Sequence, residues 1–247
     1  MKTFGLTGYP LSHSWSADYF NRKFQGLQDH EYRLFPLKTA AEINQLIISE
    51  PSLLGLNVTI PHKIAVLPFL TELSPEAGRV GAVNCVKISR EAGEIKQKGY
   101  NTDVIGFSGS LKPLLGKQHT RALVLGTGGA SKAVMFVLDQ LGIGYTLVSR
   151  NPAQAGIISY GQLNRQILQS HYLVINTSPQ GMFPNVSELP EIPYEFLDQR
   201  HLLFDLVYNP AETLFLQKGR EAGAAVKNGL EMLILQAESS WEIWNQA

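Results

Sequence analysis

The feature that most constrains the fold is the alternation of strand-like and helix-like segments along the chain. Residues 3–8, 32–37 and 55–60 are predicted strands. Between them, residues 14–24 and 40–48 have apolar side chains at the spacing of one face of a helix. Such alternation is typical of α/β proteins with a mostly parallel sheet.

The alternation continues to residue 100. Residues 64–73 are predicted to form a helix that ends at Ser74-Pro75. Residues 82–88 and 95–100 are two predicted strands, separated by a polar segment. We therefore expect the first hundred residues to form one α/β layer structure.

A second series of elements begins after Asn101. Residues 104–115 are a predicted helix, and residues 122–125 are all apolar, as expected of a parallel strand that is buried on both faces. Further predicted elements are helices at 130–141 and 162–169 and strands at 145–148, 172–176 and 203–207. This half is predicted to be a βαβ unit of its own.

The last helix is predicted from an apolar stripe that begins just after Gly229. The stripe consists of Leu230, Leu233, Ile234, Ala237, Trp241 and Trp244, at positions i, i+3, i+4, i+7, i+11 and i+14. We expect this face to be buried.

A glycine-rich loop joins the apolar strand 122–125 to the following helix and reads Gly126-Thr127-Gly128-Gly129-Ala130-Ser131. In a dinucleotide-binding loop the first Gly allows a tight turn, and the second lets the backbone approach a pyrophosphate. The third position holds Ser131 where the strict pattern has Gly. The amides of the helix N-terminus would bind the phosphates. The alternative is a glycine-rich turn without a ligand.

The end of the next strand favours NADP over NAD. NAD enzymes place an acidic residue there to bind the ribose 2′-hydroxyl, but this sequence reads Val148-Ser149-Arg150-Asn151. A carboxylate would repel a 2′-phosphate, whereas a guanidinium can bind one through two hydrogen bonds. Arg150 is therefore predicted to bind the 2′-phosphate; the alternative is a solvated loop arginine.

Two polar motifs in the first half have competing interpretations. Ser12-His13-Ser14-Trp15-Ser16 precedes a predicted helix, so its hydroxyls can cap that helix or bind a ligand carboxylate. Asn57-Val58-Thr59-Ile60-Pro61-His62-Lys63 lies where a strand ends, which is where α/β sheets bind ligands. Lys63 taken alone is more often a solvated surface lysine.

Two further motifs put polar side chains at strand ends, Gly81-Ala82-Val83-Asn84 and Asn101-Thr102-Asp103. From the residues alone, the better interpretation of Asp103 is a cap for the helix that follows.

Charge and composition exclude several classes of protein. The 247 residues include 21 basic and 21 acidic side chains, so no global positive field would hold a nucleic acid. The longest apolar stretches are far shorter than the roughly 20 residues that span a bilayer. Cys85 is the only cysteine, which excludes an internal disulfide, and the N-terminus lacks a signal-peptide pattern. We expect a cytoplasmic protein without nucleic-acid or membrane partners. The scattered six His and one Cys predict no metal site.

In this order, the motifs resemble those of the shikimate dehydrogenase family over essentially the whole chain. The resemblance rests on Ser14-x-Ser16, Asn57-Val58-Thr59-x-Pro61-x-Lys63, Gly81-Ala82-Val83-Asn84, Asn101-Thr102-Asp103, Gly126-x-Gly128-Gly129-Ala130-Ser131, Asn176-Thr177-Ser178, Asp205-x-x-Tyr208 and Gly229-Leu230-x-Met232-Leu233.

The resemblance implies a reaction and roles for residues. The reaction is the reversible oxidation of the shikimate C3 hydroxyl to 3-dehydroshikimate with NADP, in the biosynthesis of aromatic amino acids. Lys63 and Asp103 would be the catalytic pair. The implied substrate ligands are Ser14, Ser16 and Tyr208 for the carboxylate, and Thr59, Asn84 and Gln236 for the ring hydroxyls. The implied cofactor residues are Gly126, Gly128, Gly129, Ala130, Ser149, Arg150, Thr177, Val207 and Gly229.

The resemblance also implies two domains. Residues 1–103 and 229–247 would form an α/β substrate-binding domain, and residues 104–228 a Rossmann-like NADP-binding domain. One alternative is a quinate/shikimate dehydrogenase that uses NAD. Another is a catalytically silent regulatory module on the same fold, but that module should lack Lys63 or Asp103. The sequence leaves a monomer and a homodimer both open.

Overall fold

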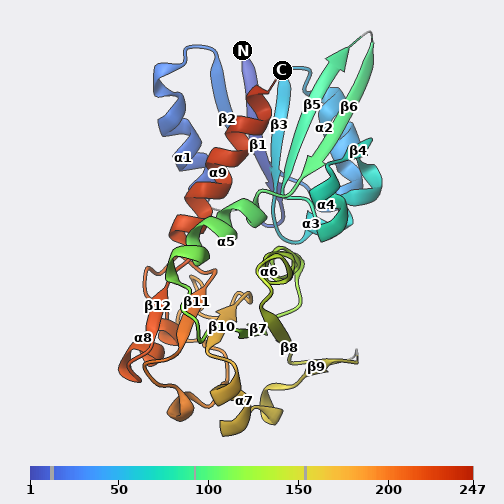
Figure 1. Ribbon diagram of the computed structural model, residues 1–247. Helices are drawn as coiled ribbons and strands as arrows, with labels where there is room; N and C mark the ends of the chain where they lie inside the picture. The colour runs from blue at the N-terminus through green and yellow to red at the C-terminus, as the bar shows by residue number, and fades with distance from the viewer. Residues whose placement is uncertain (12–13, 92, 153–154, 247) are drawn as a thin grey trace. The chain divides into compact units, whose positions relative to one another are not determined.

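The computed structural model describes residues 1–11, 14–91, 93–152 and 155–246, so Ser12 and His13 lie outside the described residues (Figure 1). The backbone divides into two compact units. The first unit is Met1–Thr102 with Ala237–Ala247, and the second is Asp103–Gln236. The sequence placed these boundaries after residues 103 and 228. No helix in the described part of the chain is long and apolar enough to cross a membrane.

The first unit contains a six-stranded sheet with the order β2-β1-β3-β5-β6-β4. Its strands are β1 (Lys2–Gly8), β2 (His30–Pro36), β3 (Leu53–Val58), β4 (Glu72–Leu73), β5 (Cys85–Glu91) and β6 (Glu94–Tyr100). β1 pairs in parallel with β2 and β3, and β4 pairs in parallel with β6, whereas β5 runs antiparallel to both of its neighbours. The predicted mostly parallel sheet is thereby confirmed.

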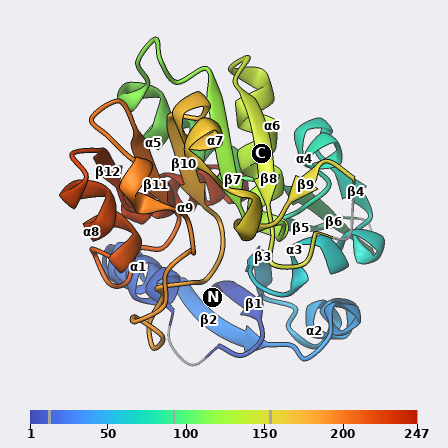
Figure 2. The ribbon, with the colours of Figure 1, turned by 90° about the horizontal axis from the view of Figure 1, so that it is seen from below.

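Helices and two apolar clusters complete the first unit. Its helices are α1 (Trp15–Lys23), α2 (Ile43–Ser49), α3 (His62–Ala65), α4 (Pro75–Val80) and the C-terminal part of α9 (Leu230–Asn245). In one cluster, Ile43 and Ile47 of α2 pack with Leu56 of β3. In the other, Phe20 of α1 packs with Trp244 of α9 and with the aromatic residues of β1 and β2. The ribbon shows α1 and α2 at separate sides of this sheet (Figure 2).

The second unit contains a six-stranded sheet in which every pairing is parallel, with the order β12-β11-β10-β7-β8-β9. Its strands are β7 (Arg121–Leu125), β8 (Gly144–Val148), β9 (Ile157–Ile158), β10 (Leu173–Asn176), β11 (Leu202–Asp205) and β12 (Ala225–Lys227). Its helices are α5 (Asp103–Leu111), α6 (Gly129–Gln140), α7 (Arg165–Ser170), α8 (Leu214–Glu221) and the start of α9. Counted from β7, this is the strand order 3-2-1-4-5-6 of a Rossmann fold. The predicted fold class is therefore confirmed.

The core of the second unit follows from its apolar strands. Residues 122–125 have no exposed surface, as the all-apolar sequence of β7 predicted. Leu123 and Leu125 pack with Val174 of β10 and Phe215 of α8. Continuous apolar runs of this kind are typical of parallel strands that are buried on both faces.

The predicted helix at 64–73 is wrong. α3 ends at Ala65, and Pro68 lies in a single 3₁₀ turn, because proline lacks the amide hydrogen that a helix interior needs. Glu72–Leu73 is instead the edge strand β4, which pairs with β6. Ser74 starts the next helix, since its hydroxyl accepts a hydrogen bond from the Ala77 amide at 3.1 Å.

The predicted strand at 82–88 begins later, at Cys85, because the Val83 amide donates to the Lys63 carbonyl. The apolar stripe of the last helix is only partly buried. Leu230 and Ile234 are 39% and 36% exposed, whereas the polar Ser240, which the predicted stripe does not include, has no exposed surface. α4, α8 and the short strands β4, β9 and β12 were not predicted.

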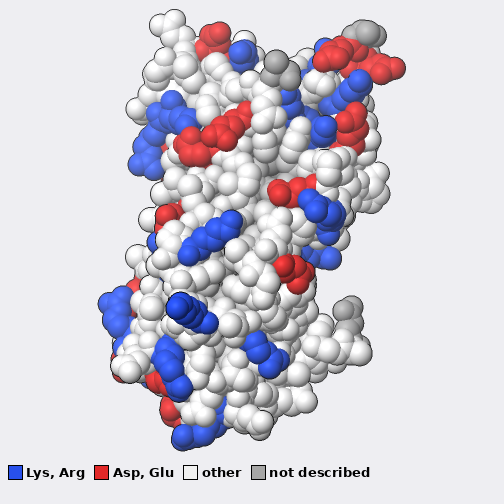
Figure 3. Space-filling model, viewed as in Figure 1, with Lys and Arg blue, Asp and Glu red and all other residues white. Residues whose placement is uncertain are grey.

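Charged side chains of both signs are interspersed on the face shown in Figure 3, and much of that face carries none. This agrees with the formal net charge of zero. Within the described residues, no three His, Cys, Asp or Glu side chains are grouped so as to hold a metal ion.

Candidate active site

The carboxyl ends of four neighbouring strands define one edge of the second unit's sheet. Leu125 of β7 pairs with Val148 of β8 and with Asn176 of β10, and Asn176 pairs with Asp205 of β11. The next residues along each strand are Gly126, Ser149, Thr177 and Leu206. Three of these four were predicted to bind the cofactor, and the register brings them to one edge. Dinucleotides bind at this edge of a Rossmann sheet, where the strand order reverses beside the first strand.

Gly126 makes the turn out of β7. Its φ is +117°, which side chains other than hydrogen rarely allow, and a Cβ there would lie 2.7 Å from Thr177 Oγ1. Both the amide and the hydroxyl of Thr177 donate to the Leu125 carbonyl at 2.9 Å. Thr177 is therefore fixed against the glycine turn.

The N-terminus of α6 has the form of a phosphate site. Among the described residues, no side chain caps this helix at Gly128, and a Cβ at Gly128 would meet nothing within 4 Å. Ser131 has no exposed surface, and its hydroxyl donates to the Gly128 carbonyl at 2.7 Å. A small buried residue therefore fills the third position of the motif, while the open backbone leaves room for a phosphate on the helix amides.

Ser149 and Arg150 follow β8. The Ser149 amide donates to the Ile158 carbonyl at 2.9 Å, and its hydroxyl accepts from the Asn151 amide at 3.2 Å. Arg150 is exposed. Burial raises the pKa of Tyr160, and the nearby charge of Arg150 opposes this rise. The loop backbone is thus anchored while the guanidinium stays accessible.

A buried carboxylate ties the loops after β10 and β11. Asp205 Oδ1 accepts from Asn176 Nδ2 and from the Val207 amide at 3.0 Å each, and Oδ2 accepts from the Thr213 hydroxyl at 2.6 Å. Burial raises the pKa of Asp205 to about 6, and the three donors oppose this rise. Asp205 was assigned no role from the sequence, where the signal that could have identified it is an acidic residue at the end of an apolar strand.

Val207 and Gly229 are joined on the same side. The Gly229 amide donates to the Val207 carbonyl at 3.0 Å. A Cβ on Gly229 would lie 2.1 Å from the Leu206 carbonyl oxygen, so no larger residue fits without a backbone shift. Tyr208, half-buried, directly follows Val207.

In the first unit, Ser14 caps α1. Its hydroxyl accepts from the Ala17 amide at 3.3 Å, so the capping interpretation describes this contact. Ser16 is half-buried in the first turn of α1. Thr59 follows β3, and its amide donates to the Thr7 carbonyl at 2.9 Å. The carboxyl ends of β1 and β3 are therefore joined at Thr59.

Lys63 lies in the short helix α3 and is half-buried. Its backbone carbonyl accepts from the Val83 amide at 2.8 Å, which links α3 to the segment that carries Asn84. The neighbouring His62 is buried, with Nε2 2.7 Å from the Leu37 carbonyl oxygen. His62 thus anchors the start of α3 in the core.

Asn84 is buried against the end of the β6 segment. Its Oδ1 accepts from the Thr102 amide at 2.6 Å, and its Nδ2 donates to Thr102 Oγ1 at 2.9 Å. Asp103, only 5% exposed, is the next residue and begins α5. Gln236 on α9 is 7% exposed, and its Nε2 donates to the Leu233 carbonyl at 2.9 Å.

Comparison with known proteins decides the family. Residues 6–86 match the family model of the shikimate dehydrogenase substrate binding domain. A shikimate dehydrogenase (NADP(+)) of Methanococcus aeolicus is 35% identical over 98% of this chain and 91% of its own length. The chain belongs to the shikimate dehydrogenase family.

Solved structures of the shikimate dehydrogenase family agree with this assignment. The chorismate mutase/shikimate 5-dehydrogenase fusion protein from Clostridium acetobutylicum is 36% identical with a TM-score of 0.86, covering 99% of this chain and 91% of that one. The shikimate 5-dehydrogenase of Thermus thermophilus, in complex with NADP(H) and shikimate, is 31% identical with a TM-score of 0.85. That match covers 99% of this chain and 94% of that one.

Proposed function

We propose that the protein is an NADP-dependent shikimate dehydrogenase that interconverts shikimate and 3-dehydroshikimate in aromatic amino acid biosynthesis. The observation that carries the proposal is the similarity to named shikimate dehydrogenases over 98% of the chain. The chain contains Lys63 and Asp103, the pair to which the family resemblance gives the catalytic role.

The second unit is proposed to bind NADP. The open backbone at Gly128 and the absence of a capping side chain among the described residues fit a pyrophosphate on α6. Gly126, Gly129, Ala130, Thr177, Val207 and Gly229 would shape this edge. The exposed Arg150, next to Ser149, would bind the 2′-phosphate through charge-assisted hydrogen bonds. When bound, NADP supplies the acceptor for the hydride.

Lys63 and Asp103 are proposed as the catalytic pair. As the C3 carbon of shikimate gives up a hydride, its hydroxyl must lose a proton, and a side chain has to receive it. The pair would hold the C3 hydroxyl and take up that proton. Because a lysine and a carboxylate at one hydroxyl titrate together, the proton belongs to the pair rather than to either residue.

The remaining substrate contacts are proposed from the family resemblance. Ser14, Ser16 and Tyr208 would bind the carboxylate, and Thr59, Asn84 and Gln236 the ring hydroxyls. The first unit would accordingly be the substrate-binding domain. The Ser14 hydroxyl accepts only the Ala17 amide in the contacts described, which leaves its own proton to donate to a carboxylate.

The alternatives have less support. An NAD-dependent quinate/shikimate dehydrogenase should have an acid at the end of β8, where this chain has Arg150. A silent regulatory module should lack Lys63 or Asp103. We propose a cytoplasmic protein that acts as a monomer or homodimer. The neutral net charge supports small-molecule partners rather than nucleic acid.

The test is turnover by the purified protein with NADP, using shikimate and quinate as separate substrates. We expect NADPH and 3-dehydroshikimate to form in equal amounts from shikimate, with slower oxidation of quinate. Faster oxidation of quinate than of shikimate would favour the quinate/shikimate dehydrogenase alternative. No oxidation of either substrate would overturn the proposal.

A further inference from the structure

A serine of the last helix lies in the core of the first unit, where an apolar residue would be expected. Ser240 follows the apolar residue Ala237 by three positions and precedes Trp244 by four, so it shares their face of α9. It has no exposed surface. A buried hydroxyl costs free energy unless it is hydrogen-bonded, so its contacts need an account.

Ser240 joins two strand ends of the first unit. Asn57 Nδ2, at the end of β3, donates to Ser240 Oγ at 2.8 Å. On the other side, Ser240 Oγ lies 3.2 Å from Thr102 Oγ1, at the end of the segment that follows β6. Asn57 and Thr102 are themselves buried, at 4% and 0% exposed.

Asn57 has a further contact, with Tyr32, which identifies the donor in its hydrogen bond with Ser240. The Tyr32 hydroxyl donates to Asn57 Oδ1 at 2.8 Å, and burial raises the pKa of Tyr32 well above its usual value, so it stays a donor. Asn57 must therefore present Nδ2 to Ser240. With its oxygen accepting from Asn57, the Ser240 hydroxyl also contacts Thr102 Oγ1 and the Cys85 side chain, and it can donate to either.

Thr102 in turn contacts both ends of the Asn84 amide. Thr102 Oγ1 accepts from Asn84 Nδ2 at 2.9 Å, and the Thr102 amide donates to Asn84 Oδ1 at 2.6 Å. Both ends of the Asn84 amide are thereby assigned. We call Tyr32, Asn57, Asn84, Thr102 and Ser240 the Ser240 network.

We propose that Ser240 is a positioning residue for shikimate oxidation, which acts by orienting the Asn84 side chain and fixing the backbone of Thr102 immediately before Asp103. This inference rests on the proposed function, in which Asn84 binds a ring hydroxyl and Asp103 belongs to the catalytic pair. Ser240 touches neither substrate nor cofactor in this account.

A purely structural serine and a positioning serine predict different kinetics. Removing the hydroxyl leaves Asn57 Nδ2 without its close acceptor and lets the Thr102 hydroxyl turn. A misplacement of substrate contacts by a fraction of an ångström lowers turnover, whereas binding of NADP should not respond. We therefore expect Ser240→Ala to lower kcat/KM for shikimate by about 10-fold, with an unchanged KM for NADP.

The experiment compares Ser240→Ala with Ser239→Ala, a neighbouring serine that is also buried, at 5% exposed, but lies outside the Ser240 network. Thr102→Val removes the next hydroxyl while keeping the side-chain shape, and it carries the test if Ser240→Ala does not fold. The double variant Ser240→Ala/Thr102→Val should be no worse than the more affected single variant, because both break one chain of hydrogen bonds.

The outcomes separate the inference from the function on which it rests. Wild-type protein without shikimate turnover would overturn the proposed function. An active wild type whose Ser240→Ala and Thr102→Val variants match Ser239→Ala in kcat/KM would overturn the positioning role alone. A rise in the KM for NADP as large as the fall in kcat/KM for shikimate would also contradict it.

Discussion

The two units present polar groups at their strand ends in different ways. In the second unit the carboxyl edge is shaped by backbone: Gly126 turns, Gly128 leaves open space, and Gly229 packs on a carbonyl. In the first unit the corresponding edge is shaped by side chains held in the Ser240 network. Backbone amides suit a phosphate, which accepts hydrogen bonds in many orientations, whereas a ring with several hydroxyls needs donors and acceptors at fixed positions.

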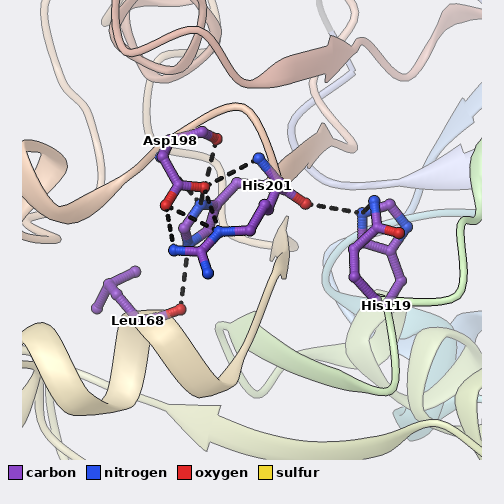
Figure 4. Close-up of polar contacts among 6 residues, drawn as sticks. His119, Leu168, Asp198 and His201 are labelled. Atoms are coloured by element: carbon purple, nitrogen blue, oxygen red, sulfur yellow. Dashed lines mark hydrogen bonds and ion pairs between the residues drawn. The ribbon is translucent and has the colours of Figure 1, made fainter.

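A second contrast lies within the second unit, between the two edges of its sheet. The amino edge carries three histidines, His119, His171 and His201, just before β7, β10 and β11. His201 contacts Asp198 through Nδ1 and the Leu168 carbonyl through Nε2, and His119 lies 3.2 Å from the Arg200 carbonyl oxygen (Figure 4). Burial lowers the pKa of His119 and of His171. For His119 and His171 burial therefore favours the neutral ring, whereas the carboxyl edge contains the buried acid Asp205.

The largest effect should come from the side chains of the first unit. Lys63→Ala should lower kcat by about 100-fold or more, the usual loss when a proton-transfer group is removed, with little change in the KM for NADP. The measurement is initial-rate kinetics at saturating shikimate and NADP. Lys38→Ala, an exposed lysine of the same unit, is the control. Near-normal turnover by Lys63→Ala would remove Lys63 from the mechanism.

The Asp205→Asn variant separates two opposite contributions to the pH dependence of stability, that of Asp205 at the carboxyl edge and that of His119 and His171 at the amino edge. The pKa of Asp205 is about 6 in the folded protein, above its ordinary 3.8, so the folded state holds this proton more tightly than the unfolded chain. The resulting stabilisation is complete below pH 3.8 and is lost as the pH rises through 6. Asparagine cannot ionise, yet it can accept from Val207 and donate to Thr213. Relative to wild type, the free energy of unfolding of Asp205→Asn should rise by about 3 kcal/mol between acid and neutral pH.

Urea unfolding across the pH range measures this change. His119 and His171 act with the opposite sign: their lowered pKa values favour the neutral ring, so their stabilisation is present above pH 6.5 and is lost as the pH falls through the folded pKa. Asp205→Asn should therefore still lose stability at low pH, because both histidines are unchanged in this variant. Parallel curves for wild type and Asp205→Asn would refute the raised pKa.

Because backbone atoms shape the proposed NADP site of the second unit, a glycine variant there should weaken NADP binding without lowering the stability of the fold. Among the described residues, a Cβ at Gly128 meets no atom within 4 Å, so Gly128→Ala should fold normally. It should weaken NADP binding by about 10-fold, or 1.4 kcal/mol, since the methyl group takes the space of the pyrophosphate. Calorimetric titration with NADP is the measurement. Gly144→Ala, at the amino edge of β8 with ordinary contacts at 3.9 Å, should bind NADP as wild type does. Unchanged affinity in Gly128→Ala would place the phosphates elsewhere.

The smallest effect should come from the exposed Arg150. Arg150→Leu should weaken NADP by about 5-fold, because an exposed charge pair contributes about 1 kcal/mol, and should leave NAD unaffected. Arg121→Leu, at the amino edge of β7, is the matched control. KM values for both cofactors provide the comparison, and equal losses for NADP and NAD would argue against a 2′-phosphate contact.

The sequence was most informative where structure depends on neighbouring residues. The apolar run 122–125 and the glycines after it predicted a buried parallel strand and the turn at Gly126, since burial and a positive φ leave direct marks on composition. It failed at residues 64–73, where helical spacing hid the effect of Pro68, and at two-residue strands such as β9, whose pairing depends on β8.

Tertiary contacts explain the other omissions. Ser240 reads as a polar interruption of a helix until Asn57, 183 positions away, is seen to donate to it. Asp205 likewise stood in a motif without a role, because its partners Asn176 and Thr213 come from separate segments. Side-chain networks of this kind link residues far apart in the sequence, so no local pattern announces them.

The most direct test of the central claim is the ratio of kcat/KM for NADP to that for NAD, measured on wild-type protein with shikimate as substrate. With Arg150 and no acid at the end of β8, we predict a ratio of at least about 10 in favour of NADP. A ratio of one or below would contradict the assignment of the second unit as an NADP site.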